Sequence, residues 1–382
     1  MSERFDEDAP LNADAELVRA AFEAGTSTAS LVEKRGDVAR LWRKRAKRVL
    51  PRWSDADGYV RLPTPNSPDA RLEKKPGVYP YSPTALQSFA SCPYRFYLYA
   101  LCRYRPAEPL DAFAVDALTR GSLLHDIYFR TGCSLRDGGL LPVHADRLPE
   151  AETLLAEHTD ACIAMARSNH GHVHQVIWDD AMAEVRQDAR EWLQALSRRA
   201  ELPIYFELAF GLEAGSDARD AASVDEAVTI DGGLKVRGSV DLVERLPDGS
   251  LRATDYKTGK PAAEAGDVVQ GGELLQPVIY ALVLEKVLPS ERISGGRLWY
   301  GTFRGEYAHV DVPLETEARQ ASRLLYEALM QSFERGCFPK APTEGACTYC
   351  EYRGFCDEAS APRAKNKPVG TLPVLAKLRG HR

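Results

Sequence analysis

Two short segments near the middle of the chain carry acidic and basic side chains at spacings suited to binding a divalent metal. They are Lys235–Arg245 (KVRGSVDLVER) and Leu251–Lys257 (LRATDYK), separated by a Pro-Asp-Gly-Ser sequence that predicts a tight turn. Side chains alternate between the two faces of a strand, so Asp255 and Lys257 are expected to project from the same face. A hairpin of the two segments would bring Asp241 within reach of Asp255.

Carboxylates are the hard oxygen ligands that Mg²⁺ prefers, and the rest of its coordination is left to water and substrate phosphate. A lysine beside such a site can orient or deprotonate a water molecule, or neutralise charge that develops as a phosphodiester is hydrolysed. The alternative is that these side chains only make an exposed strand soluble. The Asp-Tyr-Lys sequence alone leaves both interpretations open.

The cysteines form a second pattern. Cys347, Cys350 and Cys356 lie within ten residues of one another, and Cys92 is a distant fourth candidate. Four thiolates can hold an iron–sulfur cluster or a tetrahedral zinc ion, and the spacing leaves the choice of metal open. Buried thiols are the common alternative, and we interpret the scattered cysteines in that way. These are Cys102, Cys133, Cys162 and Cys337.

Seven short sequences occur in the order seen in PD-(D/E)XK nucleases of the RecB/AddB type, which the chain resembles from about Tyr81 to Asp357. The similarity is greatest to the C-terminal nuclease domain of the AddB subunit of bacterial AddAB helicase–nucleases, and exonucleases of CRISPR adaptation share the layout. The sequences are SCPYRFYLYAL, RGSLLHDIYF, FELAFG, VRGSVDLVE, ATDYKTGK, QPVIY and CTYCEYRGFC.

The resemblance implies a role for each matching residue. The Mg²⁺ (or Mn²⁺) ligands would be the side chains of His125, Asp241 and Asp255 and the backbone carbonyl of Tyr256. The catalytic group would be Lys257, working with both carboxylates and with Gln276 and Tyr280 near the site. A [4Fe–4S] cluster would be held by Cys92, Cys347, Cys350 and Cys356.

Several of these residues also have simpler interpretations. His125 alone could be a half-buried helix side chain. Together with Asp126 it also suggests an HD-type phosphohydrolase, but the further helical His and Asp ligands of that fold are lacking. Gln276 and Tyr280 share one helical face, as many core residues do. Glu207, on a predicted strand, is interpreted as structural or as supporting a ligand, with a ligand role of its own not favoured.

The order of elements predicts an α/β fold with a mixed sheet flanked by helices. The family resemblance implies that this fold is restriction-endonuclease-like. We expect a helical, basic N-terminal extension and connector at 1–80, a nuclease domain with an iron–sulfur clasp at 81–357, and a basic tail at 358–382. The predicted strands are Pro203–Leu212, Lys235–Arg245, Leu251–Lys257 and Gly296–Phe303. The predicted helices are Asp14–Leu50, Pro83–Arg103, Leu118–Thr131, Glu150–Asn169, Asp179–Ala200, Gly272–Val287 and Leu314–Arg335.

Composition is that of a cytoplasmic protein. The 382 residues carry a net charge of −6, which does not by itself indicate a nucleic-acid-binding protein. Basic residues are concentrated in Lys34–Arg52 and Arg363–Arg382, where they could contact phosphates or could be a solvated helix face and a disordered tail. No apolar run is long enough to span a membrane, and Met1–Pro10 is unlike a signal peptide.

These features together predict a metal-dependent DNA exonuclease that acts on single-stranded ends during DNA end processing and recombinational repair. The chain has no phosphate-binding loop of the Gly-x4-Gly-Lys-Ser/Thr type, so a helicase partner would supply unwinding. Two other classes stay open. One is a nuclease-like DNA-binding scaffold without cleavage activity, and the other is an interaction module stabilised by zinc.

Overall fold

The computed structural model describes residues 74–106, 111–213, 219–356 (apart from 262 and 265) and 372–381, together with short stretches between 40 and 57 and between 360 and 367. Within these residues, a five-stranded sheet has the order β1-β4-β5-β6-β7, and a small two-stranded sheet pairs β2 with β3. The strands are β1 (Leu202–Phe210), β2 (Val228–Thr229), β3 (Lys235–Val236), β4 (Gly238–Arg245), β5 (Leu251–Lys257), β6 (Ile293–Tyr300) and β7 (His309–Pro313).

The main sheet is mixed. β1, β4 and β5 are antiparallel neighbours, whereas β5 and β6 run parallel and β7 returns antiparallel to β6. Parallel strands need a crossover connection, and here it is helix α9 (Gln276–Val287). The carboxyl ends of β5 and β6 therefore lie side by side, at the sheet edge where open α/β folds bind their ligands.

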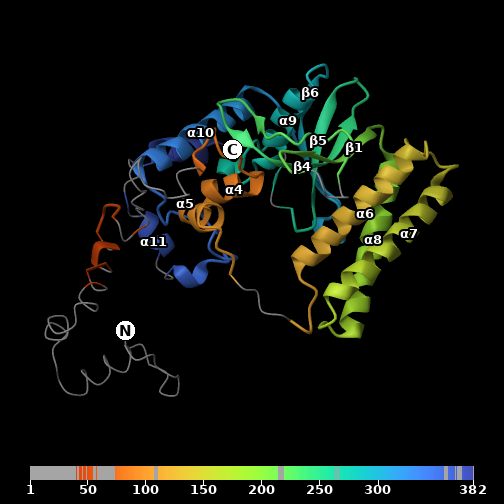
Figure 1. Cartoon of the computed structure of the whole chain (residues 1–382), viewed down its shortest axis with the longest axis horizontal. Coiled ribbons are helices and arrows are strands. Elements are labelled where there is room, and N and C mark those ends of the chain that lie inside the picture. The colour runs from red at the N-terminus through yellow and green to blue at the C-terminus, as the bar shows by residue number, and fades with distance from the viewer. Residues whose placement is uncertain are drawn as a thin grey trace.

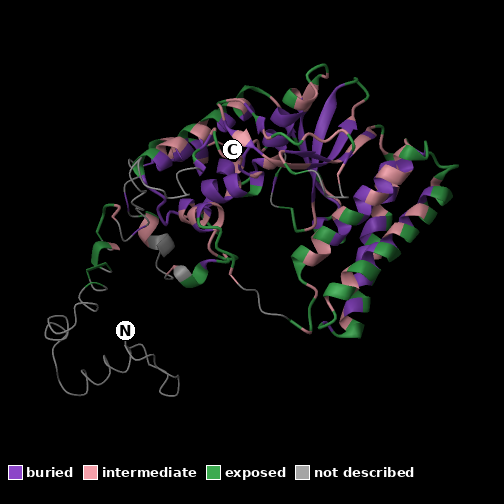
Figure 2. Cartoon of the chain, viewed as in Figure 1, coloured by how far each residue is buried: buried purple, intermediate pink, exposed green. Residues whose placement is uncertain are grey.

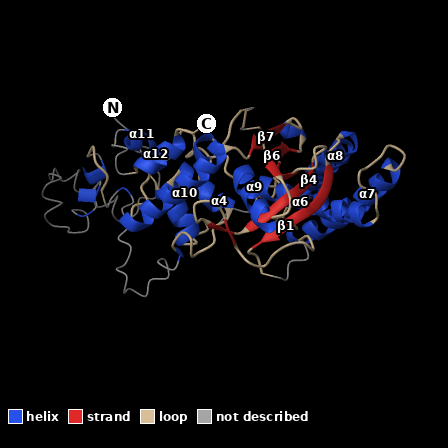
Figure 3. Ribbon diagram, turned by 90° about the horizontal axis from the view of Figure 1, so that it is seen from above, coloured by secondary structure: helices blue, strands red, loops and turns tan. Residues whose placement is uncertain are grey.

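Helices cover both faces of the sheet (Figures 1 and 3). One apolar cluster joins strand residues such as Val243 and Ala253 to α9 and to the helices on the same face of the sheet as α9. A second joins Leu242 and Tyr256, from the opposite face of the same strands, to the remaining bundle. The first group contains α4 (Pro83–Ser91), α5 (Pro93–Phe96), α10 (Thr316–Arg335) and α12 (Pro373–Arg379), and the second contains α6 (Ala117–Asp137), α7 (Leu148–Asn169) and α8 (Gln175–Arg198).

Close packing fixes α6 against β1. A Cβ at Gly132 would lie 2.3 Å from the ring of Phe206, so glycine lets the helix approach the strand. Trp192 of α8 stacks on Tyr128 of α6 and donates a 2.9 Å hydrogen bond to the hydroxyl of Tyr256. The strands and inner helix faces are buried while the outer faces of α7 and α8 are exposed (Figure 2). The bundle thus holds α6 in a fixed position over the sheet.

The predicted fold class, a helix-flanked mixed sheet of the restriction-endonuclease-like kind, is confirmed. The predicted helix at 83–103 was wrong as a single element, because Cys92 is extended (φ −160°) and Pro93 begins a new helix. Strand β7 and helix α12 were not predicted. The basic tail is partly structured, since Leu375 and Leu378 of α12 are buried.

Two other predictions concern the termini and the membrane. The predicted N-terminal helix (14–50) and the basic stretch (34–52) fall largely outside the described residues. None of the described helices combines the length and the hydropathy that crossing a bilayer requires.

Candidate metal centre

An imidazole and two carboxylates converge where α6 crosses the sheet. The Nδ1 atom of His125 lies 3.5 Å from Oε1 of Glu207 and 3.6 Å from Oδ1 of Asp241. The three candidate ligand atoms all lie within 4.8 Å of one another. One helix and two adjacent strands, far apart in the sequence, therefore present nitrogen and oxygen donors to a common point.

Glu207 owes its position to an unusual backbone conformation. Its φ is +49°, in the left-handed region that non-glycine residues rarely adopt, and its carbonyl accepts a 3.0 Å hydrogen bond from the N–H of Asp220 instead of continuing a strand ladder. Such strain, of order 1–3 kcal/mol, typically accompanies functional sites. The sequence analysis did not favour Glu207 as a ligand, but the structure places its carboxylate closer to His125 than that of Asp241.

The backbone of β5 orients the Asp241 carboxylate. The N–H of Tyr256 donates a 2.6 Å hydrogen bond to Oδ2 of Asp241. The register of β4 against β5 pairs Leu242 with Thr254, so the next position places Asp241 opposite Asp255. The ring of Tyr256 contacts Tyr128 of α6 and Trp192 of α8, so it lies on the face of β5 opposite to the side chain of Asp255.

Asp255, Lys257 and Gln276 form a closed group on the other face of β5. The Nζ atom of Lys257 lies 2.6 Å from Oδ2 of Asp255 and donates a 2.5 Å hydrogen bond to Oε1 of Gln276. The Nε2 atom of Gln276 donates a 2.9 Å hydrogen bond to Oδ1 of Asp255. Tyr280 is buried one turn further along α9, on the same helical face as Gln276. The amide thereby fixes the lysine and the carboxylate relative to each other.

Charges in the group shift several pKa values. Burial, followed by the carboxylates of Asp255 and Glu207, raises the pKa of Asp241 to about 8 even though His125 opposes the shift. Burial would lower the pKa of His125, but the neighbouring carboxylates outweigh it and raise the value to about 9. Burial likewise opposes protonation of Lys257, yet Asp255 and Asp241 raise its pKa overall. The site thus concentrates negative charge that a cation would neutralise.

These shifts predict that metal affinity depends steeply on pH. A cation that binds Asp241 and His125 must displace protons held with pKa values of about 8 and about 9. Affinity for Mn²⁺ should therefore rise as the pH is raised from 6 towards 9, by up to about tenfold per pH unit for each displaced proton, and level off above that range. Calorimetric titration with Mn²⁺ at a series of pH values measures this slope. A flat profile would show that neither residue is a ligand.

The segment that carries Cys92 contacts the segment that precedes the other three candidate cysteines, at the C-terminal end of α4. Cys92 lies at the junction of α4 and α5, and the next turn contacts the C-terminal segment, since the N–H of Tyr94 donates to the carbonyl of Pro339 (3.2 Å) and that of Thr343 to the carbonyl of Ser91 (2.8 Å). Burial is the main cause that raises the pKa of Cys92 to about 11, and proximity to Cys356 adds to it.

The remaining thiols lie near one another as well. Burial raises the pKa of Cys356, and Cys350 and Cys347 contribute to the increase. Cys356 therefore lies near Cys92 as well as near Cys350 and Cys347. Among the described residues, no three of their sulfur atoms lie within 4.8 Å of one another, in contrast to the donors of the metal centre.

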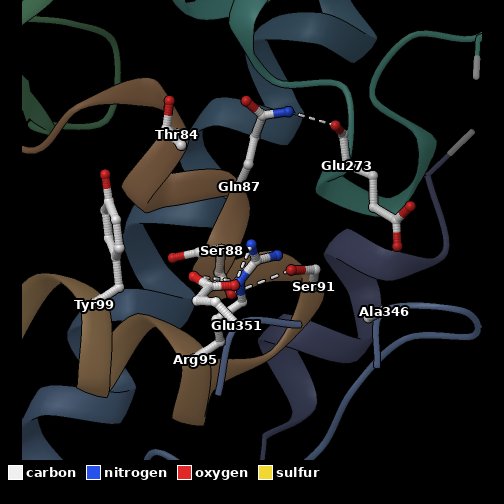
Figure 4. Close-up of a pocket in the computed structure, with 9 residues that line it drawn as sticks. All are labelled: Thr84, Gln87, Ser88, Ser91, Arg95, Tyr99, Glu273, Ala346 and Glu351. Atoms are coloured by element: carbon white, nitrogen blue, oxygen red, sulfur yellow. Dashed lines mark hydrogen bonds and ion pairs between the residues drawn. The ribbon is translucent and has the colours of Figure 1, made fainter. Parts of the chain in front are cut away.

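A cavity of about 310 Å³ opens beside the cysteine segments (Figure 4). Arg95 forms a 2.8 Å ion pair with Glu351 in its wall, and the amide of Gln87 donates to the carbonyl of Glu273 (2.5 Å). The lining contains none of the residues of the metal centre, so the cavity is distinct from the carboxylate group. It is lined by Thr84, Gln87, Ser88, Ser91, Arg95, Tyr99, Glu273, Ala346 and Glu351.

The site thus brings a helix-borne histidine, acidic side chains and a lysine together on a mixed α/β sheet. The chain belongs to the PD-(D/E)XK nuclease superfamily, whose family description matches residues 80–357. That superfamily comprises metal-dependent nucleases, so DNA is the expected class of substrate. No curated protein has significant similarity to the chain.

Proposed function

We propose that the protein is a Mg²⁺- or Mn²⁺-dependent DNA exonuclease of the RecB/AddB type that digests single-stranded ends. The observation that carries the proposal is the geometry around β5. Asp255, Lys257 and Gln276 are locked together on one side of Asp241, and His125 and Glu207 lie on the other. All of the groups expected of an active nuclease are therefore present, which argues against a scaffold without cleavage activity.

The donor set suits a hard divalent cation. We propose His125, Glu207, Asp241 and Asp255 as its protein ligands, with the carbonyl of Tyr256 as a further one. Oxygen donors and one imidazole are compatible with Mg²⁺ or Mn²⁺. Burial raises the pKa of Asp241 most, and the neighbouring carboxylates of Asp255 and Glu207 raise it further, so a bound cation would stabilise the ionised carboxylate.

Lys257 acts as a charged donor in this proposal. Its raised pKa keeps the ammonium protonated at neutral pH, which favours orienting water and neutralising negative charge over accepting a proton. Gln276 holds the ammonium in place through its amide oxygen, and the buried Tyr280 lies one helical turn beyond it. A bound divalent cation would supply the Lewis acidity that phosphodiester hydrolysis requires.

We propose further that Cys92, Cys347, Cys350 and Cys356 hold a [4Fe–4S] cluster that joins the two ends of the nuclease domain (81–357). The contacts between the α4–α5 junction and the C-terminal segment support this, because they bring Cys92 close to Cys356 and to the segment that precedes the other two cysteines. In this proposal a helicase partner supplies unwound strands for end processing and recombinational repair. The extension (1–80) would lie outside the nuclease domain, whereas the tail (358–382) joins the domain through α12, whose leucines pack in the core on the α4 side of the sheet.

Incubation of the purified protein with end-labelled DNA tests the function. Linear single-stranded DNA should be shortened from its ends in the presence of Mg²⁺ or Mn²⁺ and left intact in EDTA, while covalently closed circles should resist digestion. Circular single strands serve as the matched substrate, since they share the chemistry and lack only the ends. Cutting of circles at the same rate would replace the exonuclease with an endonuclease, and no cutting of any DNA would contradict the proposal.

A further inference from the structure

An exposed phenylalanine stands at the edge of the candidate site. Phe303 begins the short turn η5 (Phe303–Gly305) after β6, and it is 79% exposed. Arg304 beside it is also exposed. An exposed aromatic ring next to a cation is a combination that binds single-stranded nucleic acids, because bases stack on the ring and phosphates pair with the cation.

The turn lies directly beside the catalytic lysine. The N–H of Gly301 donates a 3.1 Å hydrogen bond to the carbonyl of Lys257, and the hydroxyl of Thr302 donates to the carbonyl of Thr258 (3.2 Å). Because β5 and β6 are parallel, both segments leave the sheet at the same edge. Phe303 thus directly follows Thr302, whose side chain contacts the residue after Lys257.

The protein holds this ring on a rigid base. The buried carboxylate of Asp188 accepts hydrogen bonds from the N–H of Phe303 (2.8 Å) and from the hydroxyl of Tyr307 (3.2 Å). The Thr302 hydroxyl oxygen accepts a further one from the N–H of Gly305 (3.1 Å). Tyr307 also has a left-handed backbone (φ +51°), as does the residue before it. A turn fixed by a buried acid and by backbone strain presents Phe303 in a defined orientation.

We propose that Phe303 stacks on a base of single-stranded DNA and positions the adjoining phosphodiester at the metal centre. This inference rests on the proposed function and adds the residue that distinguishes unpaired from paired substrate. In a duplex the face of each base is covered by its neighbours, whereas an unpaired base offers its face to an aromatic ring. Two exposed cations suit the phosphates of the same strand: Arg304, within the turn, and Lys260, three residues beyond Lys257.

Binding measurements test the stacking without relying on turnover. Fluorescence anisotropy with a labelled oligonucleotide, in Ca²⁺ to suppress cleavage, should show about tenfold weaker binding for Phe303→Ala, within the range for loss of one base–aromatic stack. Phe303→Trp should restore the affinity because it keeps the aromatic face. Met165→Ala, at a 51% exposed position on α7, is the matched control and should bind as wild type does.

A scan with abasic sites identifies the contact. Moving a single abasic site along the oligonucleotide should reveal one position at which wild-type binding falls about tenfold. In Phe303→Ala that position should no longer matter, since the ring that recognised the base is gone. Equal affinity of wild type and Phe303→Ala for single strands would overturn the proposal, and so would an equal loss on blunt duplex ends. Additive losses from the mutation and the abasic site would overturn it as well.

A DNA strand without bases separates this inference from the proposed function. Wild type and Phe303→Ala should degrade a fully abasic oligonucleotide at equal rates, because the metal centre is unchanged and neither can stack. Faster degradation by wild type would assign Phe303 a role other than stacking and overturn the inference. If wild type degrades no DNA of any kind, the proposed function fails, while the anisotropy experiment still decides whether Phe303 binds bases.

Discussion

Asp241→Asn is expected to abolish metal-dependent DNA cleavage, with a loss of roughly 10²–10³-fold or more, the scale associated with one preorganised electrostatic group. Asparagine keeps the size of the side chain and an oxygen that can accept the hydrogen bond from the N–H of Tyr256, so β4 and β5 should stay paired. What is lost is a negative charge between His125 and the rest of the centre. Single-turnover cleavage of labelled single strands and calorimetric titration with Mn²⁺ measure both consequences.

An independent readout comes from the histidine. Asp241 is a principal cause of the raised pKa of His125. In the variant, the pKa of this imidazole, followed by NMR, should therefore move closer to its ordinary value of about 6.5. Asp160→Asn, at an exposed ion pair on α7, is the matched control and should change neither cleavage nor that titration. Cleavage at the wild-type rate by Asp241→Asn would remove this residue from the metal centre.

Cys92→Ala is expected to have the largest effect on stability. If the four cysteines share a metal cluster, its binding free energy contributes to folding, and losing a net 3–5 kcal/mol would lower the melting temperature by roughly 10 °C. Iron and zinc analysis of anaerobically purified protein, with the broad absorbance near about 400 nm of thiolate-bound iron, identifies the metal. Calorimetry then measures the melting temperature of the variant.

The exposed Cys102 provides the control for this experiment. Cys102→Ala should keep both the metal content and the melting temperature of the wild type. Mn²⁺ binding at His125 and Asp241 should survive in Cys92→Ala below its melting temperature, because the two sites share no residues. Wild-type protein with neither iron nor zinc, or a Cys92→Ala variant as stable as wild type, would contradict the cluster.

Local patterns made the central hairpin predictable. The bounds of β5 coincide with the predicted strand Leu251–Lys257, because strict alternation and a strong turn sequence fix both its register and its beginning. The same alternation correctly placed Asp255 and Lys257 on one face, where they form an ion pair. Gln276 reaches this pair from the first turn of α9, as the predicted helix allows.

Features that depend on the rest of the fold were less accessible. The alternation of β1 does not reveal that Glu207 adopts a left-handed backbone, because that conformation is imposed by its surroundings. A polar residue within the apolar sequence FELAF was the available signal. Helix α12 was missed since its basic composition suggested a solvated tail. In the structure Lys367 is paired with Asp57, and Arg379 is largely enclosed.

The contacts of Arg379 can form only near the end of the protein's synthesis. Its guanidinium donates hydrogen bonds to the carbonyls of Ala90 (2.8 Å), which lies 289 positions earlier in the sequence, Ser91 (3.1 Å) and Ala341 (2.7 Å). At about 5–20 residues per second, a ribosome needs roughly 15–60 s to add the arginine after it has made Ala90. During that interval the C-terminal end of α4 and the adjacent Cys92 lack the contacts that Arg379 makes in the folded protein. The thiol and the apolar face of α4 are therefore accessible to chaperones and oxidants until synthesis is nearly complete.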